Sequence, residues 1–238
     1  MLDFSNSKIL IVGDVMLDKY YFGKVDRISP EAPVPIVNIQ KEESRLGGAS
    51  NVANNIVSLG GHSLLCGVIG HDLFGKEIER ISRHKNIDTF LLKTSSPTIT
   101  KARIIGGKQQ IVRVDYEDKS ELNADNKKLF RDTISRILPE YDILVISDYG
   151  KGLISEDLCR YLIKLAHKYD KKVIIDPKGK NWEKYSGADI VTPNVKELSD
   201  IVGYTVPNTD RAIEKAAREA ITNNHLTALL VTRSDKGM

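Results

Sequence analysis

The sequence predicts an α/β protein in which helices flank a doubly wound, mainly parallel sheet that carries a small β lid. Three observations support this fold class: short apolar runs alternate with helix-periodic segments, the runs are apolar at nearly every position, and two segments interrupt the alternation. Strands that are apolar throughout are typical of a parallel sheet buried on both faces. Alternation of strand and helix is typical of a doubly wound domain.

The predicted elements follow one another in a simple order. The strand-like runs are short and rich in Val, Ile and Leu, at Lys8–Gly13, Ser63–Gly70, Ile143–Ser147, Lys172–Asp176, Ala188–Thr192 and Leu226–Thr232. Helical periodicity lies between them, at Ala49–Leu59, Phe74–His84, Asn126–Leu138, Glu156–Lys168, Val195–Val202 and Arg211–Asn224. Strand and helix thus alternate over most of the chain, although the run Lys172–Asp176 is followed directly by the run Ala188–Thr192.

The interrupting segments are Tyr20–Ile39, which contains RISPEAPVPIV, and Thr89–Asp115. In the second segment, TFLLK, TITKARII and QQIVRVD predict successive antiparallel strands. We interpret the two segments, with bounds of about 18–42 and 89–115, as a lid over one edge of the main sheet. The alternative is a pair of irregular surface excursions.

Composition bounds the possible functions. The 238 residues, 41% apolar and 28% charged, suffice to bury one large core, and no linker or repeat divides them, so we expect a single domain over 1–238. A net charge of +3, evenly spread, argues against a nucleic-acid or membrane surface and favours small anionic ligands.

Cysteine usage and the N-terminus predict a cytoplasmic protein. Cys66 and Cys159 lie far apart in apolar contexts, without metal-binding spacing, which is typical of reduced core residues. The first apolar run, Ile9–Val12, is too short for a signal peptide or a membrane span. The five histidines are scattered, so we predict no direct metal site.

Two motifs near the first strand are candidates for ligand binding. Asp14 and Asp18 lie in GDVMLD, at the carboxyl end of a strand, where carboxylates can accept hydrogen bonds from sugar hydroxyls. Turn-forming Asp residues are the alternative. Gly47 and Gly48 open GGASNVA, where glycines allow close backbone approach and a helix N-terminus can face the ligand. A tight loop-to-helix junction is the alternative there.

Further polar residues follow later strands and line the second lid segment. Asp148 and Lys151 in SDYGKG, and Lys178 in IDPKG, occupy two consecutive strand ends, as expected where a cleft crosses the sheet. The lid candidates share one strand face on which cations can bind phosphate, the alternative being a solvated face; they are Lys101, Arg103 and Arg113.

The last two motifs point to a nucleotide. In TPNVKE, Asn194 and Glu197 are spaced as a capping box, and the same pair can orient water and Mg²⁺ beside ATP phosphates. Both roles are compatible. In VTRSDKG, a strand leads into a turn that can line a nucleotide pocket, with Thr232, Arg233 and Gly237 as its candidates.

Taken in order, GDVMLD, GGASNVA with Gly60, TITKAR, QQIVRVD, SDYGKG, IDPKG, TPNVKE and VTRSDKG resemble the ribokinase-like (PfkB-type) carbohydrate kinases. RISPEAPVP and SDYGKG narrow the resemblance to bacterial heptose 7-phosphate kinases. It extends over essentially the whole chain in collinear order, which makes it far more specific than any single motif.

The resemblance implies Mg-ATP-dependent phosphorylation of D-glycero-β-D-manno-heptose 7-phosphate at C1, on the route to ADP-heptose for lipopolysaccharide. By carry-over, Asp18, Gly47, Gly48 and Asn51 hold sugar hydroxyls, and the lid cations and Lys151 are candidates for the 7-phosphate. The nucleotide and its metal face Lys178, Asn194, Glu197, Thr232 and Gly237. The resemblance also implies a homodimer through the lid, and in related proteins an adenylyltransferase domain often follows on the same chain.

One required part has no candidate. The family places its general base, an aspartate, in a Gly-Ala-Gly-Asp stretch, which this sequence lacks, so we expect that base beyond Met238. We therefore interpret the domain as C-terminally incomplete and expect the chain alone to transfer phosphate very poorly. Other sugar or sugar-phosphate kinases, and a non-catalytic sugar- or nucleotide-binding domain, remain alternatives. A nicotinamide-dependent dehydrogenase fits poorly, because no dinucleotide fingerprint follows the first strand.

Overall fold

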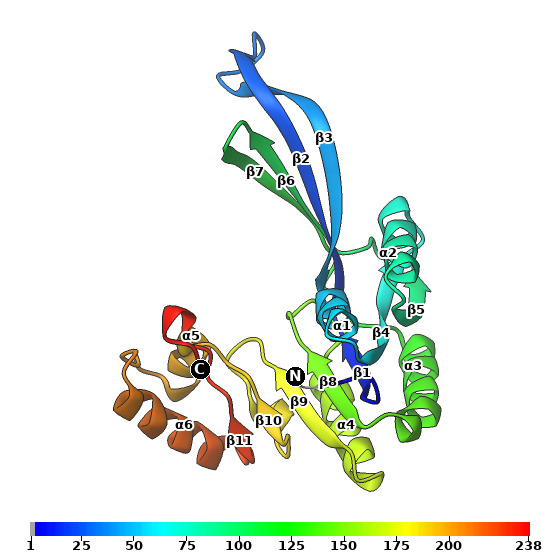
Figure 1. The fold of residues 1–238 in the computed structure, drawn as a ribbon, viewed down its shortest axis with the longest axis vertical. Helices are drawn as coiled ribbons and strands as arrows, with labels where there is room; N and C mark the ends of the chain where they lie inside the picture. Colours follow the sequence, from blue (N-terminus) through cyan, green and yellow to red (C-terminus); the bar gives the residue numbers. More distant parts are fainter. Residues whose placement is uncertain (1–2) are drawn as a thin grey trace.

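The computed structural model describes residues 3–238 and shows an elongated molecule in which a long β projection rises from a helix-covered sheet (Figure 1). The main sheet has seven parallel strands in the order β11-β10-β9-β8-β1-β4-β5. Their bounds are β1 Lys8–Gly13, β4 His62–Gly70, β5 Asp88–Thr94, β8 Ile143–Ser147, β9 Lys172–Asp176, β10 Ile190–Val191 and β11 Ala228–Leu229. The doubly wound, mainly parallel sheet is therefore confirmed.

Burial on both faces explains why β1 lies inside the sheet. Its side chains alternate between the faces, so Leu10 and Val12 join one buried cluster and Ile11 joins the other. All three are completely buried. The apolar run of β1 therefore matches two helical layers rather than one.

The helices cover these two faces. Their bounds are α1 Ala49–Ser58, α2 Leu73–His84, α3 Ala124–Ile137, α4 Glu156–Lys168, α5 Val195–Val202 and α6 Asp210–Asn224, with short 3₁₀ turns at Leu138–Glu140, Glu183–Tyr185 and Ser234–Lys236. Ala53 of α1 and Ile78 of α2 pack into the cluster that contains Ile11. Phe130 of α3 and Leu162 of α4 pack into the cluster of Leu10. No helix within residues 3–238 has the length and apolar character needed to cross a membrane.

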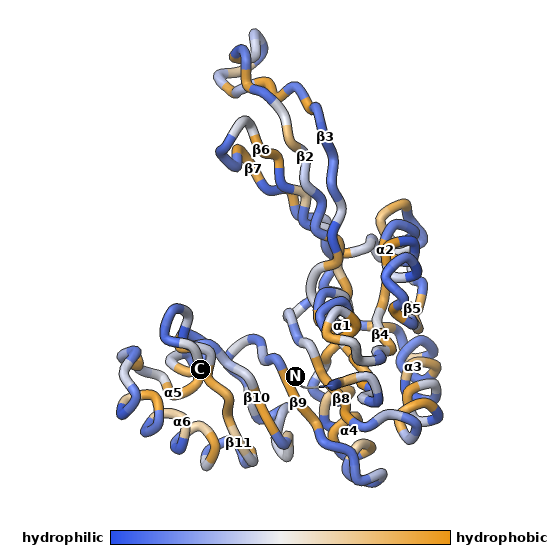
Figure 2. Tube along the Cα trace, in the orientation of Figure 1, coloured by the Kyte–Doolittle hydropathy of each residue, from blue (hydrophilic) through white to orange (hydrophobic). Residues whose placement is uncertain are grey.

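The projection is a four-stranded sheet in the order β3-β2-β6-β7. Its strands are β2 Val15–Ile28, β3 Pro35–Gly48, β6 Thr100–Gly106 and β7 Gln109–Tyr116. The pairs β2–β3 and β6–β7 are antiparallel, and β2 and β6 run parallel side by side. Figure 2 shows mixed polar and apolar residues along this sheet, which we call the lid.

The structure corrects three predictions about the strands. The TFLLK strand belongs to β5, at the edge of the main sheet, because Phe90 and Leu91 pack against the two core clusters on opposite faces. The lid strands are not all antiparallel, since β6 lies parallel to β2. The last two main-sheet strands are shorter than predicted, with two paired residues in β10 and two in β11.

Candidate active site

Most of the predicted motifs meet at one edge of the main sheet, where the parallel strands end. Asp14 follows β1, Asp148 follows β8, Lys178 lies beyond β9, and Asn194 lies beyond β10. Because these four strands are neighbours in the sheet, their carboxyl ends form one continuous rim. Ligands of open α/β sheets bind at this edge, and the lid rises from it directly after β1.

Asp14 holds the connection between β8 and α4. It is 2% exposed, and its Oδ2 accepts hydrogen bonds from the backbone amides of Tyr149 at 2.9 Å and Lys151 at 3.1 Å. Its Oδ1 is buried and has no hydrogen-bond partner within residues 3–238. Burial raises the pKa of this carboxyl above its ordinary value. One oxygen is thus committed to the fold, and the other is buried without a partner beside the cavity described next.

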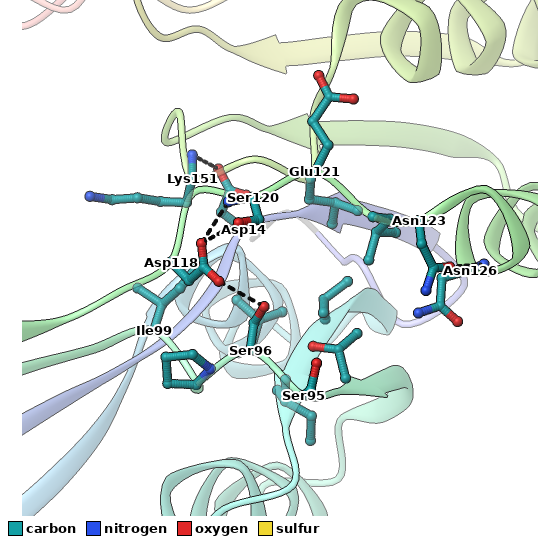
Figure 3. Close-up of a pocket in the computed structure, with 17 residues that line it drawn as sticks. Asp14, Ser95, Ser96, Ile99, Asp118, Ser120, Glu121, Asn123, Asn126 and Lys151 are labelled. Carbon is teal, nitrogen blue, oxygen red and sulfur yellow. Dashed lines mark hydrogen bonds between the residues drawn. The ribbon is translucent and has the colours of Figure 1, made fainter.

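A cavity of about 380 Å³ lies beside Asp14 (Figure 3). It is lined by β4, by the junction of β1 and β2, by the connections from β5 to β6, from β7 to α3 and from β8 to α4, and by the first turn of α3. Its polar lining consists of Asp14, Thr94, Ser95, Ser96, Asp118, Ser120, Glu121, Asn123, Asn126 and Lys151, and its apolar lining of Val15, Val68, Ile69, Pro97, Ile99, Leu122 and Leu153. Hydroxyl, amide and carboxylate groups over an apolar floor suit a polyhydroxylated ligand.

Sequence reasoning found only Asp14 and Lys151 among these cavity residues. The Ser, Thr and Asn side chains come from two loops and a helix start that carry no recognisable motif. Such residues are common in ordinary turns and helix caps, as Asn123 illustrates by capping α3. The only usable signal was their position after predicted strands, which does not distinguish a cavity wall from a surface turn.

The base of the lid brings Asp18 and Arg103 together. Arg103 Nη1 lies 2.5 Å from Asp18 Oδ1, across the parallel pair of β2 and β6. Gly47 packs directly against Asp18, because a Cβ at this position would lie 2.4 Å from Asp18 Oδ2. A side chain at position 47 would therefore have to displace the carboxylate of Asp18.

Three other predicted cations also have carboxylate partners. Lys101 and Arg113 lie 3.7 and 2.8 Å from Asp115, and Lys151 forms an ion pair with Glu117. With Arg103 and Asp18, the cluster contains four cations and three carboxylates. We call it the lid-base cluster: Asp18, Lys101, Arg103, Arg113, Asp115, Glu117 and Lys151. It has a net positive charge, and an incoming phosphate must compete with its carboxylates.

Gly48 makes the turn from β3 into α1. Its combination of φ +54° with ψ −137° is readily adopted by glycine alone, and a Cβ there would lie 2.4 Å from the carbonyl oxygen of Asp14. The amide of Ala49 donates to that same carbonyl at 3.0 Å. Asn51 follows in the first turn of α1 and is exposed. The Gly-Gly pair is predicted to allow a close backbone approach to a ligand. In the structure, Gly48 also allows a close approach to the backbone of Asp14, the residue that follows β1.

The carboxylate of Asp148 is occupied by contacts within the protein. Its carboxylate accepts hydrogen bonds from the amide of Gly150 at 2.7 Å and the hydroxyl of Tyr185 at 2.7 Å, and it forms an ion pair with Lys184. Asp148 is 2% exposed, and it is not one of the residues within 3–238 that line the cavity beside Asp14. Burial, followed by the charge of Asp148, raises the pKa of Tyr185 above its ordinary value.

The start of α5 contains the predicted capping box. Asn194 Oδ1 accepts from the amide of Glu197 at 2.9 Å, and Glu197 Oε2 accepts from the amide of Asn194 at 3.0 Å. Glu197 also lies 3.4 Å from Lys178 Nζ. Sequence reasoning missed Asp176, although it precedes Lys178 in the same motif; burial first, and then the charge of Glu197, raise its pKa to about 6.

The last motif divides between two places. Thr232 lies beside Asn194, since its amide donates to the carbonyl of Pro193 at 2.8 Å. The guanidinium of Arg233 instead binds Asn208 at 3.0 Å and Asp210 at 2.7 Å, at the start of α6. Gly237 adopts a φ of +76° at the end of the final 3₁₀ turn. Thus Lys178, Asn194, Glu197 and Thr232 gather, whereas Arg233 faces away from them.

We predict that the general base lies beyond Met238. The geometry of residues 3–238 does not single out another residue for this role. Met238 itself directly follows Gly237, is 74% exposed and does not line the cavity. Its thioether is only a weak hydrogen-bond acceptor and is not among the groups that act as general bases. The position of the base therefore stays a prediction.

The acidic residues near the start of α5 bear on metal binding. Residues 3–238 contain no group of three or more His, Cys, Asp or Glu side chains arranged to hold a metal ion. Asp176 and Glu197 nevertheless lie close enough for the charge of Glu197 to raise the pKa of Asp176. A divalent cation with several water ligands would relieve that repulsion, as Mg²⁺ commonly does beside phosphates.

Comparison with known proteins identifies a matching family and related sequences. The family model described as pfkB family carbohydrate kinase matches residues 6–238. The D-β-D-heptose 7-phosphate kinase of Bordetella bronchiseptica is 43% identical over 235 residues, which cover 98% of this chain and 73% of the relative. The bifunctional protein HldE of Haemophilus influenzae (strain PittEE) is 44% identical over 237 residues, 99% of this chain and 48% of the relative. The chain therefore spans about half the length of these bifunctional relatives.

Solved structures share the fold at low sequence identity. A tetrameric inhibited form of phosphofructokinase-2 from Escherichia coli aligns with a TM-score of 0.73 at 20% identity, over 95% of this chain and 73% of that chain. A carbohydrate kinase from Agrobacterium tumefaciens aligns with a TM-score of 0.70 at 18% identity, over 95% and 70% of the two chains. At these identities the likeness is evidence for the fold alone.

Proposed function

The chain belongs to the pfkB family of carbohydrate kinases, and from this premise we propose that it transfers the γ-phosphoryl group of ATP to C1 of D-glycero-β-D-manno-heptose 7-phosphate. The observation that carries the substrate is the 43% identity to a D-β-D-heptose 7-phosphate kinase over nearly the whole chain. The product is the 1,7-bisphosphate, on the route to ADP-heptose and the lipopolysaccharide core. The reaction uses ATP, and we assign it to the cytoplasm.

The charges of the site support a division of labour between cavity and lid. Asp14, Asp118 and Glu121 give the cavity an excess of carboxylates over Lys151, which favours sugar hydroxyls and disfavours a phosphate. The lid-base cluster shares Lys151 with the cavity and adds Lys101, Arg103 and Arg113, which makes it the better place for the 7-phosphate. The sugar then lies at the ends of β1 and β8, with its phosphate toward the lid.

The nucleotide occupies the other part of the rim in this proposal. Lys178 and Thr232 lie on either side of the start of α5, where the capping box fixes Asn194 and Glu197. Mg²⁺ would be held there through water by Asn194 and Glu197, with Asp176 nearby, and when bound it would neutralise phosphate charge. Phosphoryl transfer depends mainly on such positioning and neutralisation. We assign the general base to no residue of this chain.

The proposal includes a homodimer formed through the lid. On the lid, Ala102, Ile104, Val112 and Val114 alternate with the charged residues and therefore lie on the face opposite the lid-base cluster. Val112 and Val114 are 44% and 39% exposed, and β7 is an edge strand. Exposed apolar faces and open strand edges favour association. An adenylyltransferase region on the same chain stays a prediction.

The direct test is ADP release from Mg-ATP by the full-length protein with heptose 7-phosphate, fructose 6-phosphate or ribose as acceptor. We expect turnover with the heptose phosphate and at least about tenfold lower kcat/KM with the others. A preference for another acceptor would leave the family assignment intact and overturn the substrate. No ADP release with any acceptor would favour a binding domain.

A matched pair of variants tests the role of the lid base. Lys101→Met removes a cation of the cluster, whereas Lys108→Met removes an exposed cation at the β6–β7 turn. We expect Lys101→Met to raise KM for heptose 7-phosphate about tenfold, because a charge-assisted hydrogen bond is lost. Lys108→Met should behave as the wild type. Equal effects of the two changes would show that the phosphate binds elsewhere.

A further inference from the structure

The connection from β5 to β6 is tied to the main domain by Asp72. This residue caps the N-terminus of α2: its Oδ1 accepts from the amide of Gly75 at 2.8 Å. The same carboxylate also receives two hydrogen bonds from Thr98, from its hydroxyl at 2.7 Å and its amide at 2.8 Å. A helix cap needs only the first of these three bonds, so the contacts to Thr98 require another explanation.

Thr98 is held from both sides. It is 1% exposed, and while its hydroxyl donates to Asp72, its Oγ1 accepts from the amide of Gly70 at 2.9 Å. Two glycines keep this joint tight: a Cβ at Gly70 would lie 2.6 Å from the carbonyl oxygen of Ser96, and one at Gly75 would lie 2.6 Å from that of Gly70. The joint therefore fixes the loop in one position.

Asp72 is an ionised acceptor in this joint. Partial burial acts to raise its pKa, but the hydrogen bonds from the amides of Thr98 and Gly75 outweigh burial and keep the pKa below its ordinary value. A carboxylate that accepts several hydrogen bonds forms stronger contacts than a neutral amide would. The chemistry of the residue thus suits a latch on the loop.

The loop that this latch fixes has two connections to the candidate sugar site. Ser95, Ser96, Pro97 and Ile99 line the cavity on either side of Thr98. The carbonyl of Ile99 accepts from the amide of Leu17 at 2.9 Å, which joins the loop to β2 of the lid. Beyond it begins β6, the strand that carries Lys101 and Arg103. A shift at Thr98 would therefore move both the cavity wall and the lid cations.

The candidate nucleotide site is remote from this joint. It lies at β9 and β10, whereas α2 follows β4 and the latched loop follows β5, at the opposite end of the main sheet. Rearrangement of the loop would change the sugar side of the rim and leave the nucleotide side in place. The two substrates should thus respond differently to loss of the latch.

We propose that Asp72 is a positioning residue for the sugar phosphate, which acts through Thr98 to set the cavity wall and the register of the β6 cations. The identity of that substrate rests on the proposed function. Asp72 contacts no reacting group itself, and its effect is geometric: small misplacement of binding groups weakens binding steeply.

The test compares Asp72→Asn with the wild type in the full-length protein. Asparagine caps helices about as well as aspartate, but when its oxygen accepts from Gly75, its side-chain NH2 group takes the place of Oδ2 and cannot accept from the amide of Thr98. We expect KM for the sugar phosphate to rise about tenfold, with KM for ATP and kcat changed less than about twofold. Equal rises in both KM values, or a fall in kcat alone, would overturn the proposal.

Three companion variants separate positioning from general destabilisation. Thr98→Val removes the hydroxyl at nearly constant volume and should reproduce the rise in KM for the sugar phosphate. Thr98→Ser keeps the hydroxyl and should have the wild-type KM. Asn224→Ala removes a buried side-chain hydrogen bond at the end of α6, away from the cavity and the lid, and should leave both KM values unchanged. A wild-type sugar KM for Thr98→Val would contradict the latch.

Hydrogen exchange tests the latch without any assumption about the substrate. In Asp72→Asn, the amides of Thr98, Lys101 and Arg103 should exchange at least about tenfold faster than in the wild type, while those of α5 should not change. If heptose 7-phosphate proves to be the wrong substrate, this result still stands, and the kinetic test is repeated with the accepted sugar. Unchanged exchange at these amides would overturn the proposal.

Discussion

Asp14 combines a structural role with a proposed ligand-binding role within one carboxylate. Its Oδ2 holds the amides of Tyr149 and Lys151, and its Oδ1 lacks a partner among residues 3–238 although it is buried. Buried polar atoms without partners are costly, so they are common where a ligand completes the hydrogen bonding. The two oxygens can be separated experimentally by substituting the residue in two ways.

We predict that Asp14→Asn preserves the fold and impairs the kinase. Asparagine can still accept the hydrogen bonds of Tyr149 and Lys151 with its oxygen, but then presents a donor where Asp14 presents Oδ1. The free energy of unfolding should fall by less than about 1 kcal/mol, and kcat/KM for the sugar phosphate by at least about tenfold. Asp14→Ala, which leaves both amides unpaired, should lose about 2 kcal/mol of stability. Denaturant unfolding and steady-state kinetics measure both effects, and full activity of Asp14→Asn would contradict the role of Oδ1.

Asp176 predicts a pH dependence of stability. Its pKa is about 6 in the folded protein, against an ordinary value of 3.8, because of burial and then the charge of Glu197. The folded state thus binds the proton more tightly, so this residue's contribution to stability falls as pH rises through that window and is constant above it. Asp176→Asn should remove this slope and raise Tm at pH 7. Melting curves from pH 4 to 8 test this, with exposed Asp132→Asn in α3 as the control; a steeper slope in Asp176→Asn would contradict the assignment.

Sequence reasoning at the residue scale is better at finding motifs than at assigning partners. Asp148 is predicted as a sugar ligand because it follows a buried strand, yet its carboxylate binds Lys184 and Tyr185. Those residues lie 36 and 37 positions further along the chain. Contacts over such separations depend on tertiary structure, which local patterns do not encode. By contrast, the Asn194–Glu197 capping box is local, and it is confirmed.

At the scale of elements, the start of α5 is a helix cap that we also propose as part of the nucleotide site, and two substitutions can separate these roles. Asn194→Asp keeps an acceptor for the amide of Glu197, so stability should change by less than about 0.5 kcal/mol, whereas Asn194→Ala should lose about 1 kcal/mol. If Asn194 also serves the nucleotide, both variants should raise KM for ATP about tenfold. Thermal unfolding and ATP titrations distinguish the outcomes, and a normal KM for ATP in Asn194→Asp would restrict the residue to capping.

The main elements could be predicted where one pattern had one structural solution. The bounds of β8, β9, α4 and α5 agree with the predicted ranges because apolar runs and helix caps mark their ends clearly. The sequence places the β5 strand in the lid because TFLLK is compatible with either sheet. Its true place depends on both of its faces packing against helices, which the strand's own sequence does not specify. The parallel pairing of β2 with β6 joins distant segments and is equally invisible locally.

At the scale of the whole molecule, the lid is a thin sheet with two different faces. One carries the lid-base cluster, and the other carries Val112 and Val114, which are substantially exposed. A second copy of the chain would cover the apolar face and leave the charged face toward the substrate. The lid's projection from the main domain makes this face accessible (Figure 1).

We therefore predict that the double substitution Val112→Glu and Val114→Glu shifts the protein to monomers. Charges buried without partners are strongly unfavourable, so the dissociation constant should rise about 100-fold or more. Sedimentation velocity over a concentration series measures this, with Lys108→Glu, at the tip of the β6–β7 turn, as the control for added negative charge. A monomeric wild type, or a double variant that still dimerises, would contradict the lid interface.

The central claim, that this fold phosphorylates C1 of a heptose 7-phosphate, is tested most directly by ³¹P NMR of the reaction product. Full-length protein is incubated with Mg-ATP and D-glycero-β-D-manno-heptose 7-phosphate, and the product is observed without a coupling enzyme. We predict one new sugar phosphate resonance, coupled to the anomeric proton, with the 7-phosphate resonance retained. A new phosphate on any other carbon, or consumption of ATP without a new sugar phosphate, would contradict the account.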